Sequence, residues 1–205
     1  PRCSARCSLT TIWRISVAAL LLTGLLAGCG GGGPKFKNTD ITGVGYGEKL
    51  SLTDQNGKLR TLADFRGKVV VLFFGYTHCP DVCPTTLAEL SQVMKSLGPD
   101  ADRVQVLFVT VDPERDTPAV LARYVTAFDP RFLGLYGDAA ATRRAAKEFK
   151  VFYEKQKGSA PGEYTMDHSA GTYVIDPKGR LRLFVGYGKA DADLAHDIRT
   201  LLNQK

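Results

Sequence analysis

The sequence predicts an α/β sandwich in which helices flank a central mixed β-sheet. Strand-like and helix-like segments alternate along most of the chain, and a hairpin followed by an amphipathic helix closes it, which is typical of a layered α/β architecture. The 205 residues, 44% hydrophobic and 23% charged, suffice for one domain with a sizeable core and a short additional segment.

Turn and capping residues mark the expected elements. Asn56-Gly57 predicts a tight turn between two short strands within Leu50–Arg60, which form an N-terminal β-hairpin. Two runs, Val69–Phe74 and Val104–Val111, are apolar on both faces, as buried central strands are. A second hairpin turn is expected at Asp176–Gly179. The other expected elements are helices at Thr85–Leu97, Thr117–Phe128, Ala139–Phe149 and Asp191–Leu202, extended segments at Phe132–Tyr136, Val151–Tyr153, Tyr173–Ile175 and Leu181–Val185, and a loop at Lys157–Gly162.

The start of the chain has the features of an export signal. Basic residues precede an apolar run, Ile15–Leu26, which is shorter than the ~20 residues that a bilayer span needs. Leu26-Ala27-Gly28-Cys29 then resembles the lipobox of bacterial lipoproteins, in which the cysteine is acylated and becomes the new N-terminus. Cys29 is therefore the expected lipid attachment residue. The alternatives are a plain signal peptide or an uncleaved anchor, in which Cys29 has no role.

These features divide the chain into three parts. We expect a signal peptide of lipoprotein type over residues 1–28, a Gly-rich tether over 29–48 and a folded domain over 49–205. Cys3 and Cys7 would be removed with the signal. The mature chain would then be exported and lipid-anchored in a bacterial cell membrane, facing the periplasm or the cell exterior.

The charge balance gives no support for a nucleic-acid partner. The formal net charge is +6, but three of the 27 basic residues lie in the predicted signal, which leaves 24 basic against 21 acidic residues, or +3. No block of lysines and arginines of the kind that binds nucleic acid remains. We therefore expect no DNA or RNA partner.

The chemistry of the chain is concentrated at Cys79 and Cys83, where a buried strand leads into a helix N-terminus. Free backbone amides and the positive end of the helix dipole favour a thiolate there, and can lower a cysteine pKa from its usual ~8.5. Residues four apart in a helix or turn lie on one face, roughly 5.4 Å apart along the axis. The two sulfurs can therefore reach each other or one metal ion, and Pro80 and Pro84 stiffen the loop that holds them.

A selective metal site needs a third ligand besides the two sulfurs. The candidates are His78, His168, His196 and Met166. His196 lies on the terminal helix pattern and is expected to face solvent. His78 is expected to act as a turn residue or to support the ligands without binding the metal itself. His168 is expected on a loop that enters the strand Tyr173–Ile175, where it can face the cysteines. Two cysteines and one histidine favour Cu(I), and with one more ligand can hold Cu(II) or Zn(II).

The chain contains three short motifs that lie far apart in the sequence. They are Phe-Gly-Tyr-Thr-His-Cys-Pro-Asp-Val-Cys-Pro at Phe74–Pro84, Val-Asp-Pro-Glu-Arg-Asp-Thr-Pro at Val111–Pro118, and Asp167-His168-Ser169. Together they closely resemble the signature of the Sco/SenC family of copper proteins, and the resemblance runs from about Leu50 to the C-terminus. It implies a thioredoxin-like fold.

The resemblance also implies a site and a function. Copper, as Cu(I) and also Cu(II), would be bound by Cys79, Cys83 and His168. Asp112 matches a family position that supports the site, although a strand-end turn residue is its alternative role. The function implied is a metallochaperone that delivers copper to, or maintains the thiols of, the dinuclear copper site of cytochrome c oxidase. Expected partners are the copper-site subunit of that oxidase, other copper chaperones or thioredoxin-like reductants, and the membrane through the lipid anchor.

Two other activities are compatible with the cysteine pair. The main alternative is a thiol–disulfide oxidoreductase that uses Cys79 and Cys83, and a peroxidase has only the strand–cysteine–helix placement in its favour. A pure oxidoreductase does not need His168, whereas a copper chaperone does. Chaperone and oxidoreductase are not exclusive, because an oxidised Cys79–Cys83 pair cannot hold copper.

Overall fold

The computed structural model describes residues 35–158, 162–189 and 191–204, and the chain from Phe36 onward forms one compact unit. The predicted signal peptide, the lipid attachment residue Cys29 and the glycine run at residues 30–33 of the tether lie outside the described residues, as does the middle of the loop predicted at Lys157–Gly162. None of the helices in the described ranges combines the length and the apolar character that crossing a bilayer requires.

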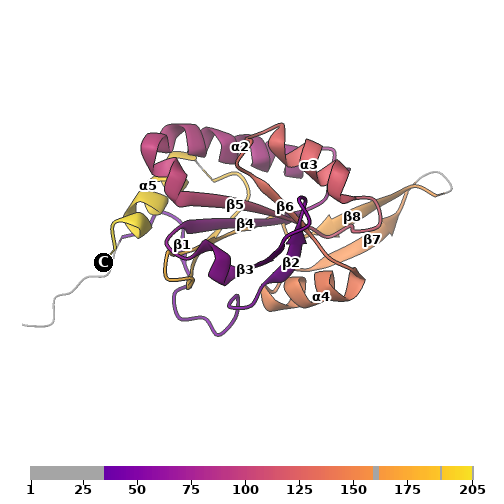
Figure 1. The fold of residues 1–205 in the computed structure, drawn as a ribbon, viewed down its shortest axis with the longest axis horizontal. Helices are drawn as coiled ribbons and strands as arrows, with labels where there is room; N and C mark the ends of the chain where they lie inside the picture. The colour runs from indigo at the N-terminus through magenta and orange to yellow at the C-terminus, as the bar shows by residue number, and fades with distance from the viewer. Residues whose placement is uncertain (1–34, 159–161, 190, 205) are drawn as a thin grey trace, which may run out of the picture. The chain divides into compact units, whose positions relative to one another are not determined.

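Strands and helices alternate through this unit as the sequence predicts (Figure 1). The strands are β1 (Thr39–Asp40), β2 (Ser51–Asp54), β3 (Leu59–Thr61), β4 (Val69–Gly75), β5 (Val104–Thr110), β6 (Leu133–Tyr136), β7 (Tyr153–Lys157), β8 (Tyr164–His168), β9 (Thr172–Ile175) and β10 (Leu181–Val185). The α-helices are α2 (Val82–Leu97), α3 (Pro118–Thr126), α4 (Ala139–Glu148) and α5 (Asp191–Leu202), and the 3-10 helices are η1 (Leu62–Phe65) and η2 (Gly98–Arg103).

The main sheet is mixed, as predicted. In the described residues its strand order is β1-β10-β9-β4-β5-β6-β2-β3, with β4, β5 and β6 parallel to one another and the remaining neighbours antiparallel. Figure 1 shows α2 and α3 on one face of the sheet and α4 on the other, and α5 packs against α2. Every residue of β4 is buried, because the strand lies in the middle of the sheet with a helical layer on each side.

Local signals explain most of these boundaries. The β2–β3 hairpin turns at Gly57, whose positive φ of 83° suits glycine. Helix α3 begins where Thr117 accepts a hydrogen bond from the Val120 amide, with Pro118 in its first turn. Helix α2 begins at Val82, three residues before the predicted start, so that Cys83 lies in its first turn.

The segment before β2 is part of the domain, whereas the sequence assigned residues 29–48 to the tether. Within it, β1 pairs with β10, and the partly buried side chains of Phe36, Ile41, Val44 and Tyr46 pack against the core. This segment carries scattered apolar residues without a helix or strand period, so its partners could not be identified from local sequence. The compact unit therefore begins at Phe36 and not at residue 49.

A separate two-stranded sheet was also missed by the sequence analysis. Strands β7 and β8 pair antiparallel, with Tyr153 opposite His168 and Lys157 opposite Tyr164. Most residues of these two strands are exposed or only partly buried, so the sequence shows little of the apolar–polar alternation from which a strand is predicted. His168 is therefore the last residue of a strand in the smaller sheet, and not part of a loop beside the main sheet.

Candidate metal centre

The structure brings Cys79, Cys83 and His168 together. One ligand atom from each residue lies within 4.8 Å of the others, and the distance from Cys83 Sγ to His168 Nε2 is 3.4 Å. Cys79 lies in the loop after β4, Cys83 in the first turn of α2, and His168 at the end of β8. Two soft sulfurs and an imidazole nitrogen at this spacing form a ligand set that suits copper.

The loop that carries Cys79 is held by a buried carboxylate. Asp116 accepts hydrogen bonds from the Thr77 amide at 3.0 Å and from the Thr77 hydroxyl at 2.6 Å. Its second oxygen also accepts from the Thr110 hydroxyl at 2.6 Å, at the end of β5. Because Asp116 is 1% exposed, these bonds are protected from water and fix the loop to the sheet beneath it.

Cys83 is placed against the end of β4, where only glycine fits. A Cβ atom on Gly75 would lie 2.8 Å from Cys83 Sγ and 2.9 Å from the Phe108 ring, and both contacts are too short. The absence of a side chain at Gly75 therefore lets the sulfur sit directly on the strand.

Burial also decides the protonation of Cys83 in the metal-free protein. The thiol is 0% exposed, and this burial raises its pKa strongly, an effect reinforced by the nearby Cys79. The lowered pKa expected at a helix N-terminus is therefore not found at Cys83, because desolvation of the thiolate outweighs the helix dipole. Binding of a cationic metal would displace the proton and supply the missing positive charge.

The ring of His168 is oriented by its neighbours. Its Nδ1 lies 3.0 Å from the Ser169 carbonyl oxygen, which can only accept, so Nδ1 carries the proton and the Nε2 lone pair faces Cys83. Phe73 and Tyr76 meet the ring edge-on, with centroids 6.1 and 5.9 Å away. Burial lowers the pKa of His168, which keeps the imidazole neutral and able to bind a metal.

The other candidate ligands lie elsewhere. The side chain of His78 is 51% exposed and lies beside Thr77 and Asp116. Met166 is buried in the hydrophobic core, and His196 is exposed on α5. Neither histidine belongs to the group of ligand atoms formed by the cysteines and His168.

Asp112 contacts the β7–β8 hairpin and has no hydrogen bond to the three ligands in the described residues. It accepts a 2.8 Å hydrogen bond from the Tyr164 hydroxyl and a short one from Arg115. Arg115 also donates to the Tyr164 carbonyl at 3.0 Å, and its guanidinium lies 3.6 Å from the centroid of the Tyr164 ring. Asp112 can thus support the site only indirectly, through the strand that ends at His168.

Sequence reasoning did not single out several residues around the ligands. They are Phe73, Tyr76, Thr77 and Asp116. All four lie inside or next to the motifs at Phe74–Pro84 and Val111–Pro118, so their segments were identified although their contacts were not.

The chain matches known proteins over the whole domain. The SCO1/SenC family model matches residues 40–203. The mouse protein SCO2 homolog, mitochondrial, is 41% identical over 158 residues, which cover 76% of this chain and 62% of the mouse protein. The bovine SCO2 homolog is 46% identical over 146 residues, 70% of this chain and 53% of that protein. The chain thus spans between half and two thirds of the length of these mammalian relatives.

Solved structures agree with the fold. Bradyrhizobium japonicum ScoI with copper bound is 43% identical and superposes with a TM-score of 0.71, covering 76% of this chain and 99% of that one. The solution structure of apo Sco1 from Thermus thermophilus is 45% identical with a TM-score of 0.72, covering 82% of this chain and 97% of that one. The predicted thioredoxin-like sandwich is thereby confirmed.

Proposed function

Because the chain belongs to the SCO1/SenC family, we propose that it is a copper metallochaperone that binds copper through Cys79, Cys83 and His168. The observation that carries the proposal is the convergence of two sulfurs and one imidazole nitrogen within 4.8 Å. The copper-bound structure of the Bradyrhizobium japonicum relative supports the choice of metal.

The arrangement suits a metal that is carried as cargo. His168 offers a neutral nitrogen, and each cysteine loses a proton when its sulfur binds the ion. Cys83 is buried, whereas Cys79 is partly exposed, so one sulfur faces the solvent side of the site. A three-ligand Cu(I) site open on that side can pass its ion to the thiols of a partner by ligand exchange.

The destination proposed for the copper is the dinuclear copper site of cytochrome c oxidase, in agreement with the family. Delivery to that site would require the exported, membrane-tethered location that the lipobox predicts. Mass spectrometry of the mature N-terminus tests the tether. An acylated Cys29 supports it, and cleavage at another position without an acyl mass would remove it.

The proposed copper binding is tested by anaerobic Cu(I) titration of the fully reduced protein, combined with X-ray absorption spectroscopy. We expect one copper per chain, coordinated by two sulfurs and one nitrogen. A spectrum without a nitrogen ligand, or binding that persists after alkylation of both cysteines, would contradict the assignment.

A thiol–disulfide oxidoreductase is the second candidate, because both cysteines are free and their sulfurs lie in one group. Attack of the Cys79 thiolate on a partner's disulfide, followed by Cys83, would oxidise this pair and reduce the partner by two electrons. Such a disulfide would also abolish copper binding. Thiol trapping after incubation with a partner disulfide or a mild oxidant detects the Cys79–Cys83 disulfide. The oxidoreductase candidate is lost if both cysteines stay reduced and the partner disulfide stays intact.

A further inference from the structure

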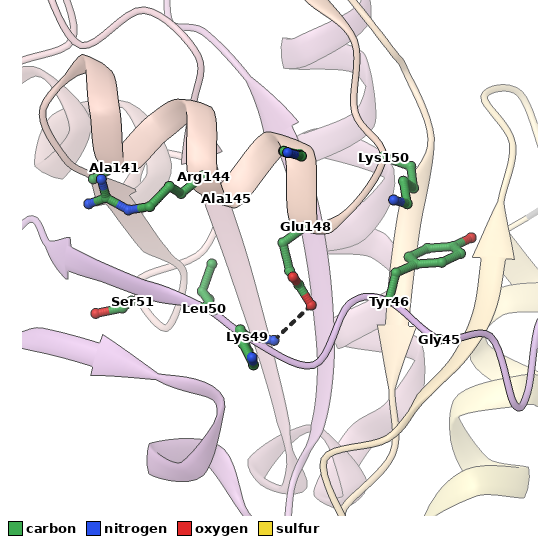
Figure 2. A pocket seen from close by; sticks show the side chains of 11 residues that line it. Gly45, Tyr46, Lys49, Leu50, Ser51, Ala141, Arg144, Ala145, Glu148 and Lys150 are labelled. Atoms are coloured by element: carbon green, nitrogen blue, oxygen red, sulfur yellow. Dashed lines mark hydrogen bonds between the residues drawn. The ribbon is translucent and has the colours of Figure 1, made fainter.

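A second cleft lies between the start of the domain and helix α4, and shares no residue with the metal centre. Its volume is about 420 Å³. One wall is the segment Gly45–Ser51, and the other is a face of α4 together with Lys150, the second residue after the helix (Figure 2).

The floor of the cleft is apolar and its rim is cationic. Leu50 and Ala145 are buried at the base, and Ala141 lies one helical turn before Ala145. The cationic residues that line the cleft are Lys49, Arg144, Lys147 and Lys150. A ligand that fits both features carries a negative group and an apolar or neutral body.

The cations of the rim have no acidic partner among the described residues. None of the four makes an ion pair there, and Lys150 Nζ lies 5.8 Å from the centroid of the Tyr46 ring. The single acid of the lining, Glu148, accepts through one oxygen from the amides of Glu48 and Lys49, at 2.9 and 3.2 Å. Figure 2 shows the Glu148 side chain extending from α4 across to the segment Gly45–Ser51. The cleft therefore keeps an excess of positive charge.

Lys150 occupies a position that glycine would fill without strain. After α4, the Lys150 amide donates to Lys147 and the Val151 amide donates to Ala146, which is the hydrogen-bond pattern of a Schellman motif. Lys150 has a φ of +57°, and no other non-glycine residue in the described ranges has a positive φ. A lysine that tolerates this conformation at the edge of a cationic cleft indicates that its side chain has a task there.

We propose that this cleft binds a phosphate group attached to a small neutral body, such as a phosphate ester or a phospholipid headgroup. Arg144 offers paired donors that match two phosphate oxygens, and the lysines of the rim raise the positive potential of the cleft. The apolar floor and the Tyr46 ring would contact the body of the ligand. A carboxylate carries less negative charge and fewer acceptor oxygens than a phosphate, so it would leave more of the cations in the rim without a partner.

The test uses the full chain with Cys29→Ser, so that no acyl chain contributes, and compares matched variants. Arg144→Gln and Lys150→Gly change the cleft. Arg143→Gln is the control, because it makes the same charge change at the neighbouring position of α4 but does not line the cleft. Calorimetric titrations use glycerol 3-phosphate, inorganic phosphate and acetate at equal ionic strength, and co-sedimentation uses phosphatidylglycerol vesicles against phosphatidylcholine vesicles.

We expect Arg144→Gln and Lys150→Gly each to weaken phosphate binding by about tenfold or more, whereas Arg143→Gln changes it less than about twofold. Binding of glycerol 3-phosphate indicates a soluble ester as the source, and binding confined to phosphatidylglycerol vesicles indicates a headgroup. Lys150→Gly should also raise the melting temperature by about 2–4 °C, because it relieves the positive φ. Copper binding should not change in any variant.

The proposal fails if none of the phosphate probes binds, if acetate binds equally well, or if Arg143→Gln has the same effect as Arg144→Gln. It also fails if Lys150→Gly lowers the melting temperature and leaves phosphate binding intact, since Lys150 would then serve the fold alone. These outcomes are measured without copper, and so are separate from any failure of the proposed metal site.

Discussion

At the scale of single residues, one backbone carbonyl prepares His168 to bind a metal. The Ser169 oxygen keeps the proton on Nδ1, which leaves the lone pair of Nε2 directed at Cys83. Burial of the ring disfavours the charged imidazolium, so the nitrogen stays available without the help of a base. The hydrogen bond to Ser169 thus selects the tautomer that copper requires, and burial of the ring selects the neutral charge state.

We therefore expect His168→Ala to weaken Cu(I) binding by more than the roughly 10–100-fold that loss of a supporting residue costs, because the change removes one of the three proposed ligands. Disulfide formation between Cys79 and Cys83 should persist. Competition against a calibrated Cu(I) chelator measures the affinity, with His196→Ala as the exposed control. Unchanged affinity in His168→Ala together with a loss in His78→Ala would show that the third ligand is His78.

At the scale of elements, the β7–β8 hairpin holds His168 through contacts outside the main sheet. Arg115 joins Asp112 to the Tyr164 carbonyl and lies against the Tyr164 ring, at the opposite end of β8 from His168. Lys155 on β7 adds an ion pair with Glu114 at 2.8 Å. In the described residues β7 and β8 pair only with each other, so these side chains, together with Met166 in the hydrophobic core, attach the hairpin to the rest of the domain.

Arg115→Met should lower copper affinity by about 10–100-fold and stability by about 3 kcal/mol, because it releases the hairpin and leaves the buried Asp112 carboxylate without its cation. Arg123→Met, at an exposed position of α3, is the matched control and should change neither. Chelator competition and urea denaturation measure the two effects. Wild-type copper affinity in folded Arg115→Met would show that the hairpin is held without this residue.

Each of the two hairpins of the main sheet, β2–β3 and β9–β10, has a buried aspartate at its turn. Asp54 pairs with Arg60 at 2.7 Å, and Asp176 pairs with Arg180 and Arg182 at 2.7 and 3.2 Å. Burial alone raises the pKa of each carboxyl, but the hydrogen bonds from arginine side chains and backbone amides outweigh it and hold the pKa below its usual 3.8. Such groups stabilise the fold above that value, and the contribution is lost as the pH falls through the lowered pKa.

Asp176→Asn should therefore cost about 3 kcal/mol at pH 7, because the buried Arg182 loses its charged partner. The variant should also lose less stability than the parent as the pH falls from about 5 through the lowered pKa, because the unfolded carboxyl takes up its proton at a higher pH than the native one. Urea denaturation across this range measures both, with the exposed Asp102→Asn as control. Parallel pH profiles for parent and Asp176→Asn would contradict the role given to this carboxylate.

At the scale of the whole molecule, the two ends of the domain are joined by one buried carboxylate. Asp197 on α5 is 0% exposed and accepts from the Lys37 amide at 2.8 Å and from the amide and side chain of Asn38 at 2.9 Å. Strand β1 follows at once and extends the sheet beside β10. The N-terminal segment thus adds a strand at one edge of the sheet and supplies hydrogen bonds to a buried carboxylate in the middle of the last helix.

A chain that begins at residue 49 should consequently be less stable than one that begins at residue 36, by about 3 kcal/mol or more. Its Asp197 carboxylate would lose the donors supplied by Lys37 and Asn38, and the core would lose the side chains packed on it. Thermal and urea denaturation of the two chains measure the difference. Equal stability would show that residues 36–48 do not contribute to the fold.

The sequence by itself determined what depends on near neighbours in the chain. The apolar run Val69–Phe74 is a central strand, Asn56-Gly57 is a hairpin turn, and Thr117-Pro118 begins a helix, because each pattern acts within a few residues. The motif at Phe74–Pro84 also pointed to the family and to the paired cysteines. Among four candidates for the third ligand, the expected placement before a strand favoured His168 without deciding the question, and the family resemblance selected the same residue.

The tertiary structure decided what joins distant parts of the chain. The contact between Cys83 and His168 spans 85 residues, and that between Asn38 and Asp197 spans 159. Neither contact can be read from a local pattern, because each joins distant segments that are brought close only when the domain assembles. The same holds for Asp116, a buried carboxylate whose sequence position suggests a turn, and whose role in holding the cysteine loop appears only once β4 and β5 lie side by side.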